Sequence, residues 1–267
     1  MIVFFRLTWL FNLGLIRDKV LRVVFLAGLF FLLLAPFVSV FSLRQVQQLL
    51  VTTTLGWLSL TLLLLALILG GGGVWRDIER RWLFSLLGLP LRRSTYLFAR
   101  ALSLVLCLSL TALFLGAVGA ALIAVMGDQY STAYVFSWVG YWCAVFFALL
   151  RYVLLALISL LLSCVSTSFF LPLFGSLAVF LAGSASQNVM DYLAGLPAEN
   201  VSPLAKLFVQ TLYVLLPNFS ALDFTTQAVY GLEIKAVDMA WGLGYFTLYT
   251  AVVLALAVWC LERRELK

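Results

Sequence analysis

Charged residues that could take part in chemistry are concentrated in one short stretch of this chain. Residues 75–93 contain a charged, helix-like segment, an apolar run and, at the end, the basic pair Arg92 and Arg93. A preference for basic residues on one side of a membrane explains the arginines, but it leaves the apolar run WLFSLLGLP unexplained. An apolar segment between charges needs a protein or membrane surface to cover it, so we expect a docking surface here.

A single charge, Arg151, interrupts the long apolar run at residues 134–163. Seventeen residues precede it in that run, which places it roughly 25 Å from the outer end of a straight helix, in the inner half of a membrane. A charge at the bilayer centre costs about 2.5–3.5 kcal/mol on insertion scales. Two interpretations remain open. The side chain snorkels to the inner interface, or it faces a subunit interface or wet pathway and pairs with a backbone carbonyl or an anionic headgroup.

The residues that most enzymes need are missing from the apolar runs. The chain has no histidine, which excludes an HExxH metal site and histidine-based acid–base catalysis. No Asp or Glu lies inside an apolar run, and a GxSxG-like serine is absent. Val74 and Trp75 follow the four-glycine run in place of Gly-Lys-Ser/Thr, so this run is no phosphate loop. The four cysteines lack metal-ligand spacing, and we expect this chain to contain no catalytic residue, metal site or cofactor.

The elements that position these residues follow from the composition. Hydrophobic residues make up 64% of the 267 residues and charged residues 10%, with a mean hydropathy of +1.12. Soluble domains have about 45–50% apolar and about 25% charged residues, so the chain is a polytopic membrane protein. Lipid forces each span to be helical, which gives an all-α fold class with six transmembrane helices. The expected spans are residues 23–41, 49–70, 101–126, 134–163, 169–183 and 240–261.

Three further segments lie outside these spans. Residues 1–22 carry Trp9 and phenylalanines flanked by basic residues, which suits an interfacial helix. Residues 71–100 form the loop after the second span, and we expect the glycine run at its start to be a flexible or closely packed junction. Residues 184–239 contain the run 204–217, which is too short and interrupted for a full span. We therefore expect a re-entrant or interfacial hairpin on the outer side, before the last helix.

The basic residues also orient the chain. Thirteen of the 17 Lys and Arg residues fall in the N-terminal segment, the loop after the second span and the C-terminal tail. Arg44, Lys206 and Lys235 fall on the opposite side. The positive-inside rule therefore predicts that both termini lie in the cytoplasm. We expect a multi-pass protein of the bacterial cytoplasmic (inner) membrane, which contacts membrane lipids and no nucleic acid.

Three stretches of the chain resemble the ABC-2 type permeases, the membrane subunits of ATP-binding cassette exporters. The first, IERRWLFSLLGLPLRRS (78–94), resembles the family's charged, Glu-containing segment followed by a leucine-rich stretch, proline and arginine. The other two are residues 212–234 and 251–266. The layout is similar as well, with six spans, both termini inside and a long outer segment before the sixth. The chain departs from the family pattern where Phe98-Ala99-Arg100 replaces a Gly-Lys pair.

The resemblance implies two membrane subunits, as a homodimer or a heterodimer, above two ATP-binding cassette ATPase subunits. ATP and magnesium would be held by the ATPase, since this chain has no phosphate loop. The ATPase-coupling residues would be Trp75, Arg76, Asp77, Glu79, Arg80, Arg81, Arg92 and Arg93. The alternatives are a membrane-embedded enzyme acting on lipid-linked substrates and a non-transporting membrane assembly or anchor protein.

Overall fold

The computed structural model describes residues 2–40, 46–79, 92–127, 136–195, 211, 213 and 216–264. All regular structure in these ranges is helical, so the predicted all-α fold class is confirmed. A short 3-10 helix, η2 (Phe219–Leu222), precedes α9. The α-helices are α1 (Ile2–Arg17), α2 (Lys19–Val40), α3 (Val46–Glu79), α5 (Arg93–Gly127), α6 (Trp138–Val165), α7 (Phe170–Gly195), α9 (Thr225–Tyr230) and α10 (Ala236–Arg263).

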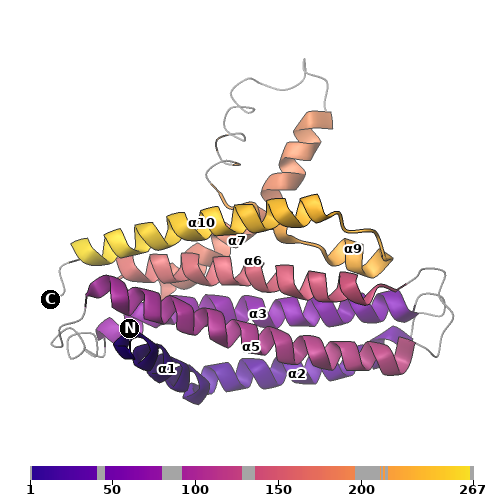
Figure 1. Ribbon diagram of the computed structural model, residues 1–267, viewed down its shortest axis with the longest axis horizontal. Helices are drawn as coiled ribbons and strands as arrows, with labels where there is room; N and C mark the ends of the chain where they lie inside the picture. The colour runs from indigo at the N-terminus through magenta and orange to yellow at the C-terminus, as the bar shows by residue number, and fades with distance from the viewer. Residues whose placement is uncertain are drawn as a thin grey trace.

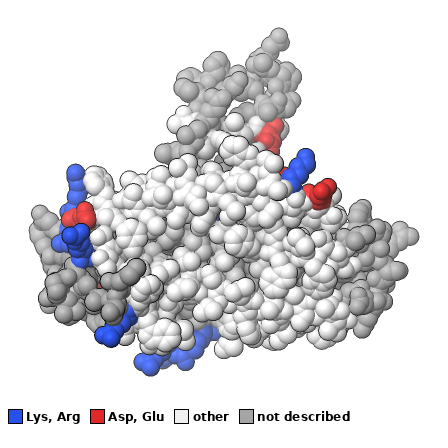
Figure 2. All heavy atoms as spheres, in the orientation of Figure 1, with Lys and Arg blue, Asp and Glu red and all other residues white. Residues whose placement is uncertain are grey.

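Six helices, α2, α3, α5, α6, α7 and α10, are long and apolar enough to cross a membrane. Most of them run along the long axis of the molecule, and both chain ends lie at the same end of the bundle (Figure 1). Many of the charged side chains visible in Figure 2 lie towards that end, and the middle of this face is largely uncharged. The chain is therefore a multi-pass helical membrane protein. We call the end that carries Arg76, Arg93 and Arg264 the basic end.

Small residues bring α3 and α6 into the most extensive helix contact of the bundle. A Cβ atom on Gly70 would lie 2.6 Å from the carbonyl oxygen of Ala156, so glycine permits this close approach. Ser163 Oγ of α6 donates a hydrogen bond to the carbonyl oxygen of Gly71 at 2.8 Å. Such packing and interhelical hydrogen bonds hold helices together in lipid, where the hydrophobic effect does not drive their association.

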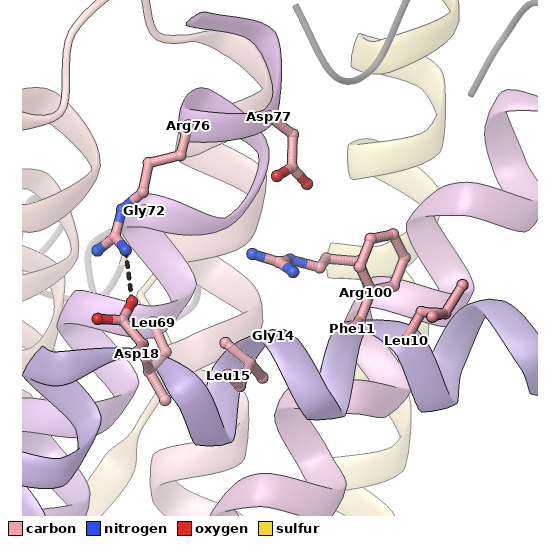
Figure 3. Close-up of a pocket in the computed structure, with 10 residues that line it drawn as sticks. All are labelled: Leu10, Phe11, Gly14, Leu15, Asp18, Leu69, Gly72, Arg76, Asp77 and Arg100. Carbon is pink, nitrogen blue, oxygen red and sulfur yellow. Dashed lines mark hydrogen bonds and ion pairs between the residues drawn. The ribbon is translucent and has the colours of Figure 1, made fainter. Parts of the chain in front are cut away.

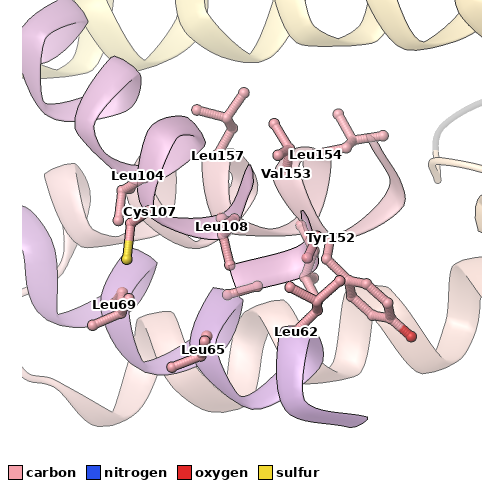
Figure 4. Close-up of a cluster of buried hydrophobic side chains, with 14 of the residues drawn as sticks. Leu62, Leu65, Leu69, Leu104, Cys107, Leu108, Tyr152, Val153, Leu154 and Leu157 are labelled. Carbon is pink, nitrogen blue, oxygen red and sulfur yellow. The ribbon is translucent and has the colours of Figure 1, made fainter. Parts of the chain in front are cut away.

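An apolar core surrounds this contact along the middle of α3, α5 and α6. α3 occupies the centre of the bundle, since 67% of the residues in its most apolar stretch are buried. The corresponding share for α10 is 11%. α10 therefore faces lipid or another chain over most of its length. The core side chains shown in Figure 4 include Leu62, Leu65, Leu69, Leu104, Leu108, Leu154 and Leu157.

The loop expected at residues 71–100 is mostly helix. α3 continues through the four glycines to Glu79, and α5 begins at Arg93. The glycines are buried, and a Cβ on Gly71 would touch both α6 and α7. The glycines are therefore closely packed, which is one of the two forms expected for this junction, and α3 continues beyond them. The helix continues because a buried backbone away from water is satisfied best by its own hydrogen bonds.

Two pieces of the chain, the first part of α7 and residues 219–230, both run antiparallel to α6. We call these two pieces together the fifth crossing. The first part of α7 follows the second half of α6, with the ring centroids of Phe180 and Tyr152 5.9 Å apart. Residues 219–230 follow the first half of α6, with the ring centroids of Phe224 and Phe147 4.4 Å apart. Together the two pieces cover α6 over most of its length, which neither covers alone.

Between the two pieces, the chain leaves the bundle and returns to the same place. The last turns of α7 stand away from the other helices (Figure 1). On the return, Ser220 Oγ donates to the carbonyl oxygen of Ser184 at 3.0 Å. The expected span at residues 169–183 lies within α7, which is long and apolar enough to cross a membrane. Within the segment expected on the outer side, residues 219–230 pack against the first half of α6. The expected hairpin at 204–217 lies almost wholly outside the described residues.

Gly70→Ala tests the close approach of α3 and α6. The added methyl group would lie 2.6 Å from the Ala156 carbonyl oxygen, so the helices must separate. We expect a loss of about 1–3 kcal/mol, as for other overpacked interiors, measured by thermal unfolding of the protein in detergent. The matched control is Gly56→Ala in the same helix, where a Cβ meets nothing within 4 Å. Equal stability of the two variants would contradict the contact.

Candidate functional site

The predicted coupling residues on α3 tie the end of this helix to its neighbours. Trp75 Nε1 donates to a backbone carbonyl in the connection between α6 and α7, at 3.1 Å. Arg76 forms an ion pair with Asp18, between α1 and α2, with 2.6 Å between Nη1 and Oδ2. The hydroxyl of Tyr96 on α5 donates to Asp77 Oδ2, also at 2.6 Å. The last turns of α3 are thus fixed to the helices on each side.

Two arginines cap helix C-termini at the basic end. Arg93 Nη1 donates to three backbone carbonyl oxygens at the end of α10, at 3.0–3.1 Å. Arg264 donates to the carbonyl oxygens of Cys164 and Ser166 at the end of α6, at 2.6 and 2.8 Å. The last carbonyls of a helix have no partner within it, and a cation there complements the helix dipole. Arg93, a predicted coupling residue, therefore joins α5 to α10.

Glu79 and Arg92 are the predicted coupling residues whose side chains the structure shows to be exposed. They flank the segment 80–91, which lies outside the described residues together with Arg80 and Arg81. The structure thus divides the predicted set by position. Trp75, Arg76, Asp77 and Arg93 contact the bundle, and Glu79 and Arg92 remain accessible at the ends of the helices that carry the segment.

Arg151 forms an ion pair half-way along α6. Its Nη1 lies 2.8 Å from Asp223 Oδ2, and the two side chains are 14% and 38% exposed. The guanidinium also lies over the ring of Phe180, 5.1 Å from its centroid. Asp223 ends η2, and its Oδ1 accepts a hydrogen bond from the backbone N–H of Thr225. The pair therefore joins α6 to both pieces of the fifth crossing.

The sequence analysis singled out Arg151 but missed its partner. Asp223 comes 72 residues later, in a segment expected on the outer side. In the structure the guanidinium of Arg151 pairs with this carboxylate. The partner is neither a backbone carbonyl nor a headgroup. One signal could have found it, since a buried cation needs an anion and Asp223 stands alone within the apolar stretch FSALDF.

A polar cavity of about 540 Å³ lies beside this pair, between residues 213–227 and the first half of α10. Asn218, in the cavity wall, joins α7 to α10. Its Nδ2 donates to Gln187 Oε1 at 2.8 Å, and its backbone N–H donates to the hydroxyl of Tyr245 at 2.6 Å. Gln227 Oε1 is buried and has no hydrogen-bond partner within the described residues. The polar lining residues are Tyr213, Asn218, Ser220, Asp223, Gln227, Asp238, Tyr245 and Tyr249.

A scan of the chain against protein-family models gives no match, and a search of curated proteins finds no similar sequence.

Within the ranges that the structure describes, no three His, Cys, Asp or Glu side chains are grouped so that they could hold a metal ion. The candidate site offers an ion pair, amides and tyrosine hydroxyls around a cavity.

Asp223→Asn tests the ion pair. The change leaves the charge of Arg151 without a counterion on a largely buried side chain, so we expect a loss of stability. Exposed pairs contribute about 0–1 kcal/mol and breaking a buried pair costs about 3–5 kcal/mol, so this partly exposed pair should cost about 1–3 kcal/mol.

Thermal unfolding in detergent measures this loss, and Glu233→Gln, which removes an exposed carboxylate nearby in the sequence, is the control. The double variant Asp223→Asn with Arg151→Gln should recover part of the loss, since it removes both charges. Additive losses in the double variant would show that the two residues do not interact.

Proposed function

We propose that this chain is the permease subunit of an ATP-binding cassette exporter of the ABC-2 type. The observation that carries the proposal is the Arg151–Asp223 pair, which lies half-way along α6 beside a polar cavity. Ionisable residues within membrane spans are costly, and they commonly mark the path of a substrate or ion. A protein that serves only as an anchor has no need of such a pair or of a cavity.

The broken fifth crossing supports the same proposal. Transporters often form binding sites near the bilayer midplane from discontinuous helices, whose free backbone groups line the site. Here the break between α7 and η2 brings Asn218 and Ser220 to the wall of the cavity. The wall offers amide, hydroxyl and carboxylate groups for binding, and an enzyme acting on lipid-linked substrates would need a nucleophile or metal in addition.

The basic end supports docking on a separate ATPase, which would hold ATP and magnesium. Glu79 and Arg92 are exposed on either side of segment 80–91, whose apolar run needs a cover. Hydrogen bonds and ion pairs fix α3 and α5 to the bundle at the same level. A movement of the ATPase that displaces the segment would therefore displace these helices together with α6 and α10. Two permease chains, identical or different, would complete the pathway.

Reversal of two charges, Glu79→Lys with Arg80→Glu, tests the docking surface. Coexpression with a candidate ATP-binding cassette ATPase subunit allows the complex to be purified and its affinity measured. We expect binding at least tenfold weaker, about 1.4 kcal/mol, which exceeds the effect of an ordinary exposed pair. The control reverses Glu233 and Lys235, which are exposed near the start of α10. If the first variant binds the ATPase fully and its ATP hydrolysis is fully stimulated, the charges of this segment serve only to orient the chain in the membrane.

Arg151→Leu tests the pathway in proteoliposomes that contain the complete complex. We expect substrate-stimulated ATP hydrolysis to fall by at least tenfold while membrane insertion and ATPase binding stay normal, because the partner of Arg151, Asp223, lines the cavity. The stability of the variant is measured in parallel, so that misfolding is recognised. Unchanged transport of every substrate found would end the assignment of Arg151 to the pathway.

A further inference from the structure

A second cavity, of about 240 Å³, lies at the basic end between α1, α3 and α5. α1 packs along α5 and forms one wall, through Leu10, Phe11, Gly14 and Leu15. Leu69, Gly72 and four charged residues line the remainder (Figure 3): Asp18, Arg76, Asp77 and Arg100. The cavity is separate from the polar cavity beside Asp223, and the docking proposal uses Arg76 and Asp77 only as contacts that fix α3 to its neighbours.

Arg100 is buried in this cavity with few partners. The residue is 9% exposed, and its guanidinium points between Asp77 and the Arg76–Asp18 pair (Figure 3). Nη2 lies 3.4 Å from the carbonyl oxygen of Gly73, and Nε has no hydrogen-bond partner within the described residues. A guanidinium has five N–H donors, so most of the donors of Arg100 are available to a ligand in the cavity.

The carboxylates of the cavity differ in what they can still bind. Asp18 pairs with Arg76 through Oδ2 and accepts the backbone N–H of Val20 through Oδ1. Asp77 accepts the hydroxyl of Tyr96 through Oδ2, and its Oδ1 accepts no hydrogen bond within the described residues. The cavity therefore presents one cation and one carboxylate oxygen in need of partners, with a formal charge of zero over its four charged groups.

We propose that this cavity binds the headgroup of a phospholipid that carries both a phosphate and a primary ammonium group. The planar guanidinium of Arg100 receives the phosphate, whose oxygens match its fork of donors. Asp77 Oδ1 receives the ammonium group. A purely anionic group would satisfy Arg100 but would be repelled by the carboxylate of Asp77, whereas a zwitterionic group is attracted by both.

The surroundings favour a lipid over a soluble molecule as the source of this headgroup. The cavity is lined by Leu10, which is 54% exposed, and the neighbouring Trp9 is 66% exposed. Exposed leucine and tryptophan side chains on a helix at the end of the spans are typical of the membrane interface. An acyl chain could therefore continue from the bound headgroup along α1.

The test is the thermal unfolding of the purified full-length chain in detergent, with added dioleoyl phosphatidylethanolamine, phosphatidylcholine or phosphatidylglycerol. We expect the first lipid, at saturating concentration, to raise the Tm by about 5 °C. The second should raise it less, because a quaternary ammonium cannot donate a hydrogen bond to Asp77, and the third less because it lacks an amine. Soluble phosphoethanolamine should have a weaker effect than the lipid.

Three variants locate the response. Arg100→Gln should abolish the preference for phosphatidylethanolamine, and Asp77→Asn should make the three lipids equivalent. Gly14→Leu should block the cavity without disturbing the fold, since a Cβ there meets nothing within 4 Å and leucine favours a helix. The control, Arg17→Gln, removes an exposed charge from α1 outside the cavity lining, and it should leave the lipid response unchanged.

Several outcomes would overturn the proposal. Equal shifts with all three lipids in the unmodified protein would show nonspecific stabilisation, as would a full response of the Gly14→Leu variant. A stronger response to phosphatidylglycerol or inorganic phosphate would assign the cavity to a simple anion. An equal response to soluble phosphoethanolamine at the same concentration would contradict a lipid source.

Discussion

Lipid offers no hydrogen bonds to a polypeptide backbone, and this constraint shapes the whole molecule. Long unbroken helices meet it along α3, α5 and α6, even through four consecutive glycines. Where helices end, arginine side chains bond the free carbonyl oxygens of α6 and α10. Where the fifth crossing breaks, Asn218 Oδ1 accepts the backbone N–H groups of Ser220 and Ala221. At these three places a side chain satisfies the backbone where the helix ends or breaks.

The break in the fifth crossing links the fold to the candidate pathway. A continuous helix would present mainly side chains to α6, whereas the break brings the amide of Asn218 and the carboxylate of Asp223 to the middle of the bundle. Asp223 can reach Arg151 because η2 ends at this level. The same irregular segment forms one wall of the polar cavity, and α10, the least buried of the crossing helices, forms the other.

At the basic end, one set of charged residues has several structural roles. Ion pairs and hydrogen bonds fix the ends of α3, α5, α6 and α10 to one another. These contacts use Arg76, Asp77 and Arg93, whereas Glu79 and Arg92, on either side of residues 80–91, remain exposed. The arginine that remains poorly satisfied, Arg100, lies behind α1. Docking and headgroup binding would therefore use neighbouring but different residues.

The sequence alone determined the fold class, six apolar helices and the clustering of basic residues, because hydropathy and charge are properties of local stretches. It also identified Arg151 as unusual and the glycine run as a flexible or closely packed junction. The tertiary structure decided the rest. Asp223 as the partner of Arg151, the two-piece crossing and the inward contacts of Trp75 and Asp77 all join residues far apart in the chain. Hydrophobic periodicity in the sequence does not predict such contacts. They depend on which helices become neighbours and on where along the bundle each segment of the chain packs.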